Sequence, residues 1–401
     1  MSWLSTSQRA VAETLIQQHD TPFFCYDLDK LSAHVTPLID QQVVKLWYAV
    51  KANPLSHIIK TLDHVGFNFD VASSGELDQV LSQGIAPERV LNTGPAKSLK
   101  QIRHFARQGV RIFVAESHNQ VRWLNQVAAE FDLQFEVLLR VQLRFDKAEH
   151  NPLGGNTLTP FGLGAAQWQA LTLNDYTQLD FIGLHIFQWG NMLSSDTLAE
   201  LWQAMVAPLV QLSEALGITL KVLDLGGGLG IPYDTQSPSL HWQKLIDTLA
   251  TIKAATQVEE LWMELGRYAV GECGFYLNPV VEQKQNYDEQ QLIVSGGVNH
   301  LLRPAVTGQA FPAELLRSST AECIDFHIHG PLCTALDKLG TLPLPNDCAE
   351  GDWLVFSQCG AYGYTESMPF FLCHELPAEY VISDGDVICA RPVESAMSYL
   401  R

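Results

Sequence analysis

The chain has 401 residues, of which 47% are hydrophobic and 17% charged, and its formal net charge is −19 at pH 7. This length exceeds that of one hydrophobic core, so we expect a large domain with a smaller one, and the apolar content argues against a disordered chain. The negative charge repels phosphate backbones and anionic membranes, so neither nucleic acid nor a membrane surface is an expected partner. The sequence shows no signal peptide and no apolar run of membrane-spanning length, which predicts a cytoplasmic protein.

The cysteine pattern does not indicate a metal site. Seven of the eight cysteines lie in the last third of the chain, and no two form a CxxC pair. Neither a zinc site nor a disulfide framework is therefore predicted. We expect most of these thiols to be buried, with Cys333 as a candidate exception.

The first two thirds of the chain alternate short apolar runs with segments of helical spacing, after a first short strand at 21–26. Such alternation indicates a parallel sheet. The eight strands predicted here are 45–50, 69–72, 90–92, 111–115, 135–141, 181–186, 222–225 and 261–264. The helices predicted between them are 57–65, 76–83, 119–129, 197–216 and 242–256. Eight repeats predict a (β/α)8 TIM barrel, with a doubly wound open sheet as the alternative.

Two other stretches depart from this rhythm. Residues 145–159 are rich in Asn, Gly and Pro and are predicted to form a loop over the barrel mouth, without any indication of whether it closes. From about residue 275, strand-like runs follow one another with Pro, Gly and Asp turns, which predicts a C-terminal, mainly-β domain. Its predicted strands are 275–281, 292–295, 323–329, 353–356, 380–382 and 387–390.

A lysine follows the first strand of the predicted barrel. The apolar run Trp47–Val50 leads into Lys51, and Asn53-Pro54 ends it, because a residue before proline avoids helical geometry. The carboxyl ends of barrel strands are where such folds place chemistry. A partly desolvated lysine there has a lowered amine pKa and can form a Schiff base with an aldehyde. The alternative is a lysine that only extends past the strand end into solvent.

The last two strands of the predicted barrel also end in candidate site residues. Gly226, Gly227 and Gly228 follow the seventh strand, where adjacent glycines let backbone amides face a phosphate. Glu264 ends the eighth strand, where a carboxylate can keep a pyridine nitrogen protonated, and Arg267 adds charge for a phosphate. The alternative for Glu264 and Arg267 is a structural ion pair at the domain junction.

Six motifs in this order resemble the fold-type III pyridoxal phosphate decarboxylases, whose members include diaminopimelate and ornithine decarboxylases. The motifs are Tyr48-Ala49-Val50-Lys51-Ala52-Asn53, Phe69-Asp70-Val71-Ala72-Ser73-Ser74-Gly75-Glu76, Gly226-Gly227-Gly228, Glu264-Leu265-Gly266-Arg267, Gly330-Pro331-Leu332-Cys333 and Gly360-Ala361-Tyr362. They span almost the whole chain. The resemblance implies an alanine-racemase-like barrel, pyridoxal 5'-phosphate as cofactor, and a head-to-tail homodimer with active sites shared between subunits. With it we predict an N-terminal segment 1–26 packing with the β domain, a barrel at 27–270 and a β domain at 271–401.

The resemblance also implies roles for single residues. Lys51 would carry the cofactor as a Schiff base, and Glu264 would face the pyridine nitrogen. Cys333 would reach the partner's site as an acid that protonates the carbon left by CO2, with Asp337 nearby. The other residues expected to bind the cofactor are Asp70, Phe187, Gly226, Gly227, Gly228, Gly266, Arg267 and Tyr362.

Three departures from the family pattern narrow the substrate. Thr334 follows the cysteine where enzymes acting on basic amino acids carry an acid, and Thr307 stands where diaminopimelate enzymes carry a tyrosine after the Arg303 turn. Phe187 replaces the histidine expected to stack on the cofactor, and its ring can stack but cannot share a proton. A site without the acid would leave a distal ammonium unpaired, which disfavours diaminopimelate, ornithine and lysine.

The sequences around His185, Asn299 and Thr334 resemble a second branch, which decarboxylates citrate-conjugated amino acids in siderophore biosynthesis or carrier-tethered amino acids. We therefore expect the α-carboxylate of a substrate such as citryl-serine or citryl-diaminopropionate to be removed. Arg303 and His300 are candidates for meeting the acidic conjugate, unless they only hydrogen-bond at the domain junction. The residues expected near the substrate are His300, Arg303, Thr334 and Asp337.

Three other functions remain open from the sequence. One is diaminopimelate decarboxylase itself. Another is an amino-acid racemase that uses Tyr362 or Tyr364 as a base. The third is a non-catalytic pyridoxal phosphate-binding regulator, although such proteins typically lose the lysine, the cysteine or the β domain, all of which this chain keeps.

Overall fold

The computed structural model describes residues 2–144, 150–151, 154–155 and 158–400 and divides into two compact units. The barrel unit comprises His34–Ile231 and Pro238–Tyr268. The β unit comprises Met1–Ala33, Pro232–Ser237 and Ala269–Arg401. The limits 1–26, 27–270 and 271–401 stay predictions.

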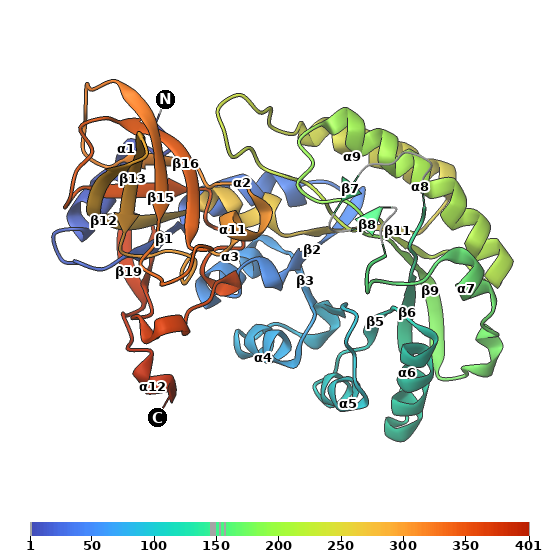
Figure 1. The fold of residues 1–401 in the computed structure, drawn as a ribbon. Coiled ribbons are helices and arrows are strands. Elements are labelled where there is room, and N and C mark those ends of the chain that lie inside the picture. The colour runs from blue at the N-terminus through green and yellow to red at the C-terminus, as the bar shows by residue number, and fades with distance from the viewer. Residues whose placement is uncertain (1, 145–149, 152–153, 156–157, 401) are drawn as a thin grey trace. The chain divides into compact units, whose positions relative to one another are not determined.

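The barrel unit is a closed cylinder of eight parallel strands in the order β10-β11-β2-β3-β4-β5-β6-β9 (Figure 1). The strands are β2 Val44–Ala49, β3 Asn68–Val71, β4 Val90–Asn92, β5 Ile112–Ala115, β6 Phe135–Arg140, β9 Leu179–His185, β10 Val222–Asp224 and β11 Glu260–Leu265. All eight predicted strands are present, and β11 pairs with β2 to close the sheet. The prediction of a TIM barrel is therefore confirmed, and the open doubly wound sheet is excluded.

Helices alternate with these strands along the chain. They are α2 Leu28–Ile39, α3 Ser56–Val65, α4 Ser74–Ser82, α5 Leu99–Arg107, α6 His118–Phe131, α7 Ala165–Gln169, α8 Ser195–Leu216, α9 Trp242–Thr256 and α10 Arg267–Val270. Serine N-caps begin α4, α5, α6 and α8, each accepting a hydrogen bond from a backbone amide. Gly66 and Gly217 end α3 and α8 at φ of 110° and 69°, as expected for left-handed C-caps.

The predicted loop at 145–159 lies partly outside the described residues. Two short strands within it, β7 His150–Asn151 and β8 Gly154–Gly155, pair antiparallel. Its position over the barrel mouth stays a prediction.

The β unit is built on one nine-stranded sheet in the order β16-β15-β13-β12-β1-β18-β19, with β17 pairing β12 and β14. The strands are β1 Phe23–Asp27, β12 Gly274–Asn286, β13 Glu289–Val294, β14 Ala313–Leu315, β15 Cys323–His329, β16 Lys338–Pro345, β17 Trp353–Ser357, β18 Ala378–Ser383 and β19 Asp386–Arg391. Its helices are α1 Thr6–Leu15, α11 Arg303–Thr307 and α12 Met397–Leu400. The prediction of a C-terminal, mainly-β domain is confirmed.

The N-terminal segment belongs to the hydrophobic core of the β unit. Strand β1 pairs with β12 antiparallel and with β18 parallel. Leu4 and Leu15 pack with Phe23 and Leu277 in one buried cluster. The chain thus begins in the unit that it also ends in.

The prediction that most cysteines are buried was wrong. Only half of the eight free thiols are buried, and the exposed ones are Cys323, Cys333, Cys373 and Cys389. Cys389 is exposed because it lies on β19, at the edge of the sheet.

Within the described part of the chain, no helix combines the length and apolarity that crossing a membrane requires.

Candidate active site

Polar side chains stand at or just after the carboxyl ends of all eight barrel strands. Because the strands are parallel, these ends open at the same mouth of the barrel, where TIM-barrel enzymes place their chemistry. The residues are Lys51, Asp70, Thr93, Glu116, Arg140, His185, Asp224 and Glu264.

Lys51 lies at the rim of the barrel with a buried carboxylate behind it. Strand β2 ends at Ala49, and a 3-10 turn over Val50–Ala52 carries Lys51 out of the strand. The Lys51 side chain is 46% exposed, and its Nζ lies 3.3 Å from Oδ2 of Asp70, whose side chain is only 1% exposed. Burial, together with the charge of Glu264, raises the pKa of Asp70 to about 6. The amine is therefore both accessible and electrostatically held.

Three buried groups lie on the neighbouring strands β9, β10 and β11. The His185 Nε2 atom and the Glu264 Oε1 atom are 3.0 Å apart, and Asp224 lies beside them. Burial acts to raise the pKa of Glu264, but the charge and hydrogen bond of His185, with smaller effects of Lys51 and Arg140, outweigh it and lower that pKa. Glu264 is thus a buried carboxylate that stays ionised.

The triple glycine after β10 is required by close packing of backbone against backbone. A Cβ on Gly227 would lie 1.9 Å from the carbonyl oxygen of Glu264, and one on Gly226 would lie 2.8 Å from Cβ of Phe187. Gly226 and Gly228 also have φ of 65° and 92°, which L side chains rarely adopt. The loop therefore presents bare backbone beside the Phe187 ring.

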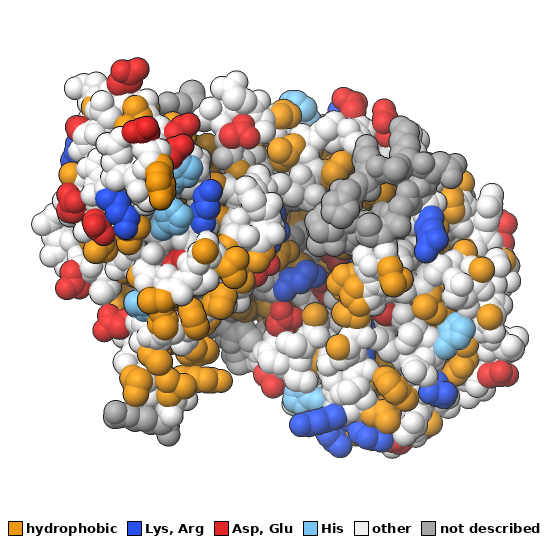
Figure 2. All heavy atoms as spheres, in the orientation of Figure 1, with side chains coloured by type: hydrophobic (Ala, Val, Ile, Leu, Met, Phe, Trp, Pro, Cys, Tyr) orange, Lys and Arg blue, Asp and Glu red, His pale blue; other side chains and the backbone are white. Residues whose placement is uncertain are grey.

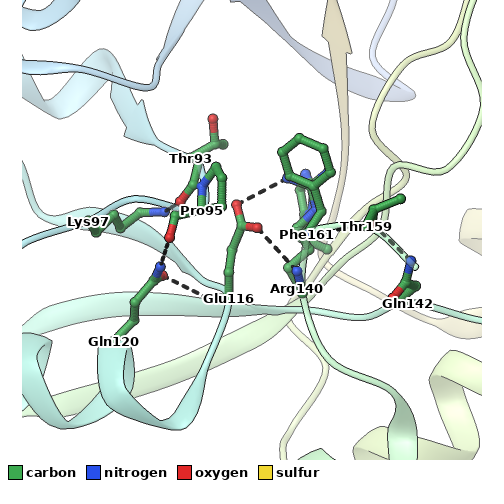
Figure 3. A network of polar contacts seen from close by, with 12 residues as sticks. Thr93, Pro95, Lys97, Glu116, Gln120, Arg140, Gln142, Thr159 and Phe161 are labelled. Carbon is green, nitrogen blue, oxygen red and sulfur yellow. Dashed lines mark hydrogen bonds and ion pairs between the residues drawn. The ribbon is translucent and has the colours of Figure 1, made fainter. Parts of the chain in front are cut away.

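A second polar network joins the ends of β4, β5 and β6 (Figure 3). Buried Glu116 accepts a hydrogen bond from Arg140 at 3.1 Å and another from the amide of Gly162 at 3.1 Å. Lys97, which is also buried, donates to the carbonyl oxygen of Gly94 at 2.5 Å. Burial lowers the pKa of Lys97 to about 8.

In the β unit, Asp337 fixes the turn that carries Cys333. Asp337 is 2% exposed, and its two carboxylate oxygens accept hydrogen bonds from the amides of Val298 and Leu332, each at 2.7 Å. Cys333 is exposed, while the hydroxyl of Thr334 accepts a hydrogen bond from the backbone amide of Leu336 at 3.3 Å. Asp337 therefore binds backbone within its own unit.

The remaining predicted residues of the β unit differ in charge. Arg303 donates to Glu366 at 2.8 Å and lies 4.8 Å from the centre of the Tyr362 ring. His300 is buried against the Tyr276 hydroxyl at 2.7 Å, and burial lowers its pKa to about 4. His300 is therefore neutral near pH 7, so Arg303 is the better candidate for an acidic group.

The structure thus collects the predicted residues into two sets. The barrel unit holds Lys51, Asp70, Phe187, Gly226, Gly227, Gly228, Glu264, Gly266 and Arg267. The β unit holds His300, Arg303, Cys333, Thr334, Asp337 and Tyr362.

Sequence reasoning assigned no role to His185, Asp224, Glu116, Arg140 and Lys97. Four of these five residues end an apolar strand run or follow it directly, as Lys51 and Glu264 do. A search for the first polar residue after each run would have found them. Lys97 offers no such signal, because it lies in the loop after β4.

The barrel residues fit pyridoxal 5'-phosphate. An accessible amine suits its aldehyde, the bare backbone of the triple glycine suits its phosphate, and the ionised Glu264 carboxylate suits a protonated ring nitrogen. All three features lie in the barrel unit.

Comparisons with known proteins agree with this fit. The family described as "Pyridoxal-dependent decarboxylase, pyridoxal binding domain" matches residues 29–271. The L-glutamyl-[BtrI acyl-carrier protein] decarboxylase of Niallia circulans is 26% identical, over 94% of this chain and 92% of that protein. The diaminopimelate decarboxylase of Aquifex aeolicus is 26% identical, over 95% of this chain and 91% of its own length. The 2-[(L-alanin-3-ylcarbamoyl)methyl]-2-hydroxybutanedioate decarboxylase of Staphylococcus aureus is 25% identical, over 92% and 96%.

A solved structure shows the same fold. Diaminopimelate decarboxylase from Helicobacter pylori, complexed with L-lysine, superposes with a TM-score of 0.87 at 23% identity, over 96% of this chain and 98% of that one. The predicted cofactor and class of enzyme are confirmed by the family match. The chain therefore belongs to the pyridoxal-dependent decarboxylases and is an amino-acid carboxy-lyase that uses pyridoxal phosphate.

Proposed function

We propose that this enzyme removes the α-carboxylate of an amino acid whose distal end is already conjugated to an acidic group, such as citryl-diaminopropionate or citryl-serine in siderophore biosynthesis. The observation that carries the proposal is Thr334 after Cys333, where a carboxylate would be needed to meet a distal ammonium. The Staphylococcus aureus relative supports it, because its name describes a citrate-conjugated amino acid.

In this proposal the barrel residues bind and orient the cofactor. Lys51 would hold it covalently, Asp70 would keep the amine in place, and Phe187 would lie beside its ring. The amides of Gly227 and Gly228 would meet the phosphate, with Gly266 and Arg267. When bound, the cofactor supplies a protonated ring that withdraws the electrons left behind by departing CO2.

The β-unit residues complete the reaction and select the substrate. Cys333 delivers a proton to the carbon that has lost its carboxylate, and its exposed turn suits a group that reaches the partner subunit's site. Arg303 meets the acidic conjugate in competition with Glu366. Asp337 holds the cysteine turn through the amide of Leu332.

A homodimer with shared sites is part of this proposal. Figure 2 shows apolar side chains gathered around α12 on the β unit. The exposed apolar residues in this region are Met368, Phe370, Phe371, Leu372, Met397, Tyr399 and Leu400. Apolar patches of this kind mark protein interfaces more often than free surface.

Diaminopimelate decarboxylase is the second candidate, because several curated relatives carry that name. The racemase alternative is disfavoured at Tyr364, since burial raises the pKa of this phenol to about 12 and so keeps it protonated near pH 7, where a base would have to be ionised.

The test is CO2 release by the purified enzyme from citryl-diaminopropionate, citryl-serine and meso-diaminopimelate, compared at equal concentration. We expect turnover of a citryl substrate, and turnover of meso-diaminopimelate alone would overturn the proposal.

Thr334→Asp should lower kcat/KM for the citryl substrate by about tenfold or more, since a carboxylate beside an acidic conjugate costs at least about 1.4 kcal/mol if it is unscreened. Thr341→Asp, at an exposed position of β16 in the same unit, is the matched control.

A further inference from the structure

The ends of β9, β10 and β11 bring one imidazole between two carboxyl groups. Asp224 is directly opposite His185 in the register of β10 and β9, and it is opposite Trp262, two residues before Glu264, on β11. One ligand atom from each of the three side chains lies within 4.8 Å of the others. The three residues are 1%, 0% and 9% exposed, in the order His185, Asp224, Glu264. The register of the strands therefore brings three titratable side chains together in the buried interior of the barrel.

The hydrogen bonds of this trio leave one donor or acceptor open on each of two residues. His185 uses Nε2 for Glu264, and Asp224 uses Oδ1 to accept the amide of Gly226 at 2.8 Å. Nδ1 of His185 and Oδ2 of Asp224 have no hydrogen-bond partner among the described residues. A buried nitrogen that can donate and a buried oxygen that can accept thus stand on adjacent strands. Such unsatisfied pairs are rare in native interiors unless they have a function.

Without the two neighbouring carboxylates, a protonated His185 would be unfavourable in this buried position. Burial and the nearby Arg140 both act to lower the pKa of His185, whereas Glu264 and Asp224 act to raise it and prevail. Asp224 in turn faces the negative charges of Glu264 and Asp70, which with burial raise its pKa. Lys51 and Arg140 add positive charge on the Glu264 side. His185 therefore depends on both carboxylates to hold a proton.

We propose that Asp224 is a positioning residue that keeps His185 protonated, so that Glu264 stays ionised and holds the proton on the ring nitrogen of the cofactor. The proposal rests on the proposed role of Glu264 and extends the proton control of the ring to two residues that do not touch it. Asp224 also accepts a hydrogen bond from the amide of Gly226, the first residue of the triple-glycine loop. The proposed phosphate-binding loop is therefore linked to the same aspartate that acts on His185.

A different occupant of the same space is a metal ion, since one histidine and two carboxylates are common ligands. The hydrogen bond between His185 and Glu264 argues against it, because a metal would need the same two lone pairs. Metal analysis of the purified protein distinguishes the two. We call the proposed action of Asp224 on Glu264 through His185 the relay. A stoichiometric metal ion that is lost in Asp224→Asn would overturn this relay.

The decisive measurement is the absorbance spectrum of the cofactor-loaded enzyme against pH, without substrate. Because the pKa of Asp224 is raised to about 7, Asp224→Asn removes a negative charge above that pH. The variant keeps an oxygen for the amide of Gly226. In this variant, the pH midpoint of the spectral transition that reports loss of the proton from the ring nitrogen should move down by about one unit or more. A shift of this size is expected when an opposite charge within about 4–6 Å is lost. Asp180→Asn, on the half-exposed start of β9 beside Lys221, is the matched control and should leave the midpoint unchanged.

A double substitution separates action through His185 from a merely structural role. In a His185→Gln background, Asp224→Asn should add no further shift, because the residue it acts on is gone. If Asp224→Asn does not fold, His185→Gln alone must still shift the midpoint downward. Equal, additive shifts in both backgrounds would overturn the relay. A wild-type protein that never binds pyridoxal phosphate would overturn the proposed function and the relay together, whereas bound cofactor with an unmoved midpoint would overturn the relay alone.

Discussion

Replacing Asp337 with alanine tests whether this buried carboxylate holds the cysteine turn to the β unit. The side chain is 2% exposed and accepts two backbone amides, those of Val298 and Leu332, each at 2.7 Å. Its removal leaves two buried donors without acceptors, at a cost of about 1–3 kcal/mol each, so the free energy of unfolding should fall by about 2–6 kcal/mol. Gly297 packs directly against this carboxylate, since a Cβ on Gly297 would lie 1.9 Å from Oδ1 of Asp337.

Urea unfolding followed by fluorescence measures this change, and the rate at which a thiol reagent labels Cys333 reports on the turn itself. Labelling of Cys333 should become faster in Asp337→Ala, because the turn loses its anchor, while labelling of exposed Cys323 stays the same. Asp325→Ala, at an exposed position on β15, is the matched control and should change stability by less than about 0.5 kcal/mol. A loss below about 1 kcal/mol in Asp337→Ala, with unchanged labelling, would refute the reasoning.

Three further predictions concern the barrel unit. Lys51→Ala should abolish the visible absorbance of bound cofactor and reduce CO2 release to background, as spectra and a carbonate assay would show. Gly227→Ala should destabilise the protein by about 1–3 kcal/mol in thermal or urea unfolding, because its Cβ would lie 1.9 Å from the Glu264 carbonyl oxygen, whereas Gly75→Ala, with 3.9 Å to its nearest neighbour, should not. Burial raises the pKa of Asp224 from 3.8 to about 7, so the folded state binds this proton more tightly than the unfolded chain. Its contribution to stability should fall as pH rises through that window, and the difference between wild type and Asp224→Asn in unfolding experiments should show this slope.

The sequence predicted the barrel well because its strands are buried on both faces. Such strands read as continuous apolar runs that end in one polar residue, and β4 was predicted to the residue. Helix α5 was not among the predicted helices, although Ile102, Phe105 and Ala106 give it a buried face. Strand β16 was missed because it contains Pro343 and Pro345, which are tolerated only because this strand lies at the edge of the sheet.

The candidate site could be predicted only where one residue carried the signal alone. Lys51, Glu264 and the triple glycine each stand out within a short motif. The contact between His185 and Glu264 could not be read in this way, because the two residues are 79 positions apart and meet only after the barrel closes. Closure depends on β11 pairing with β2, a long-range contact that no local pattern specifies.

Charge balance at the barrel mouth follows from this closure. Four acidic groups, Asp70, Glu116, Asp224 and Glu264, face four basic ones, Lys51, Lys97, Arg140 and His185. Seven of these eight are buried, and buried charges persist only when they are compensated. A phosphate added to such a balanced set therefore needs donors from outside it, which is the role that the glycine amides and Arg267 are placed to fill. The same balance explains why removing a single charge, such as that of Asp224, should change the protonation of groups that it does not touch.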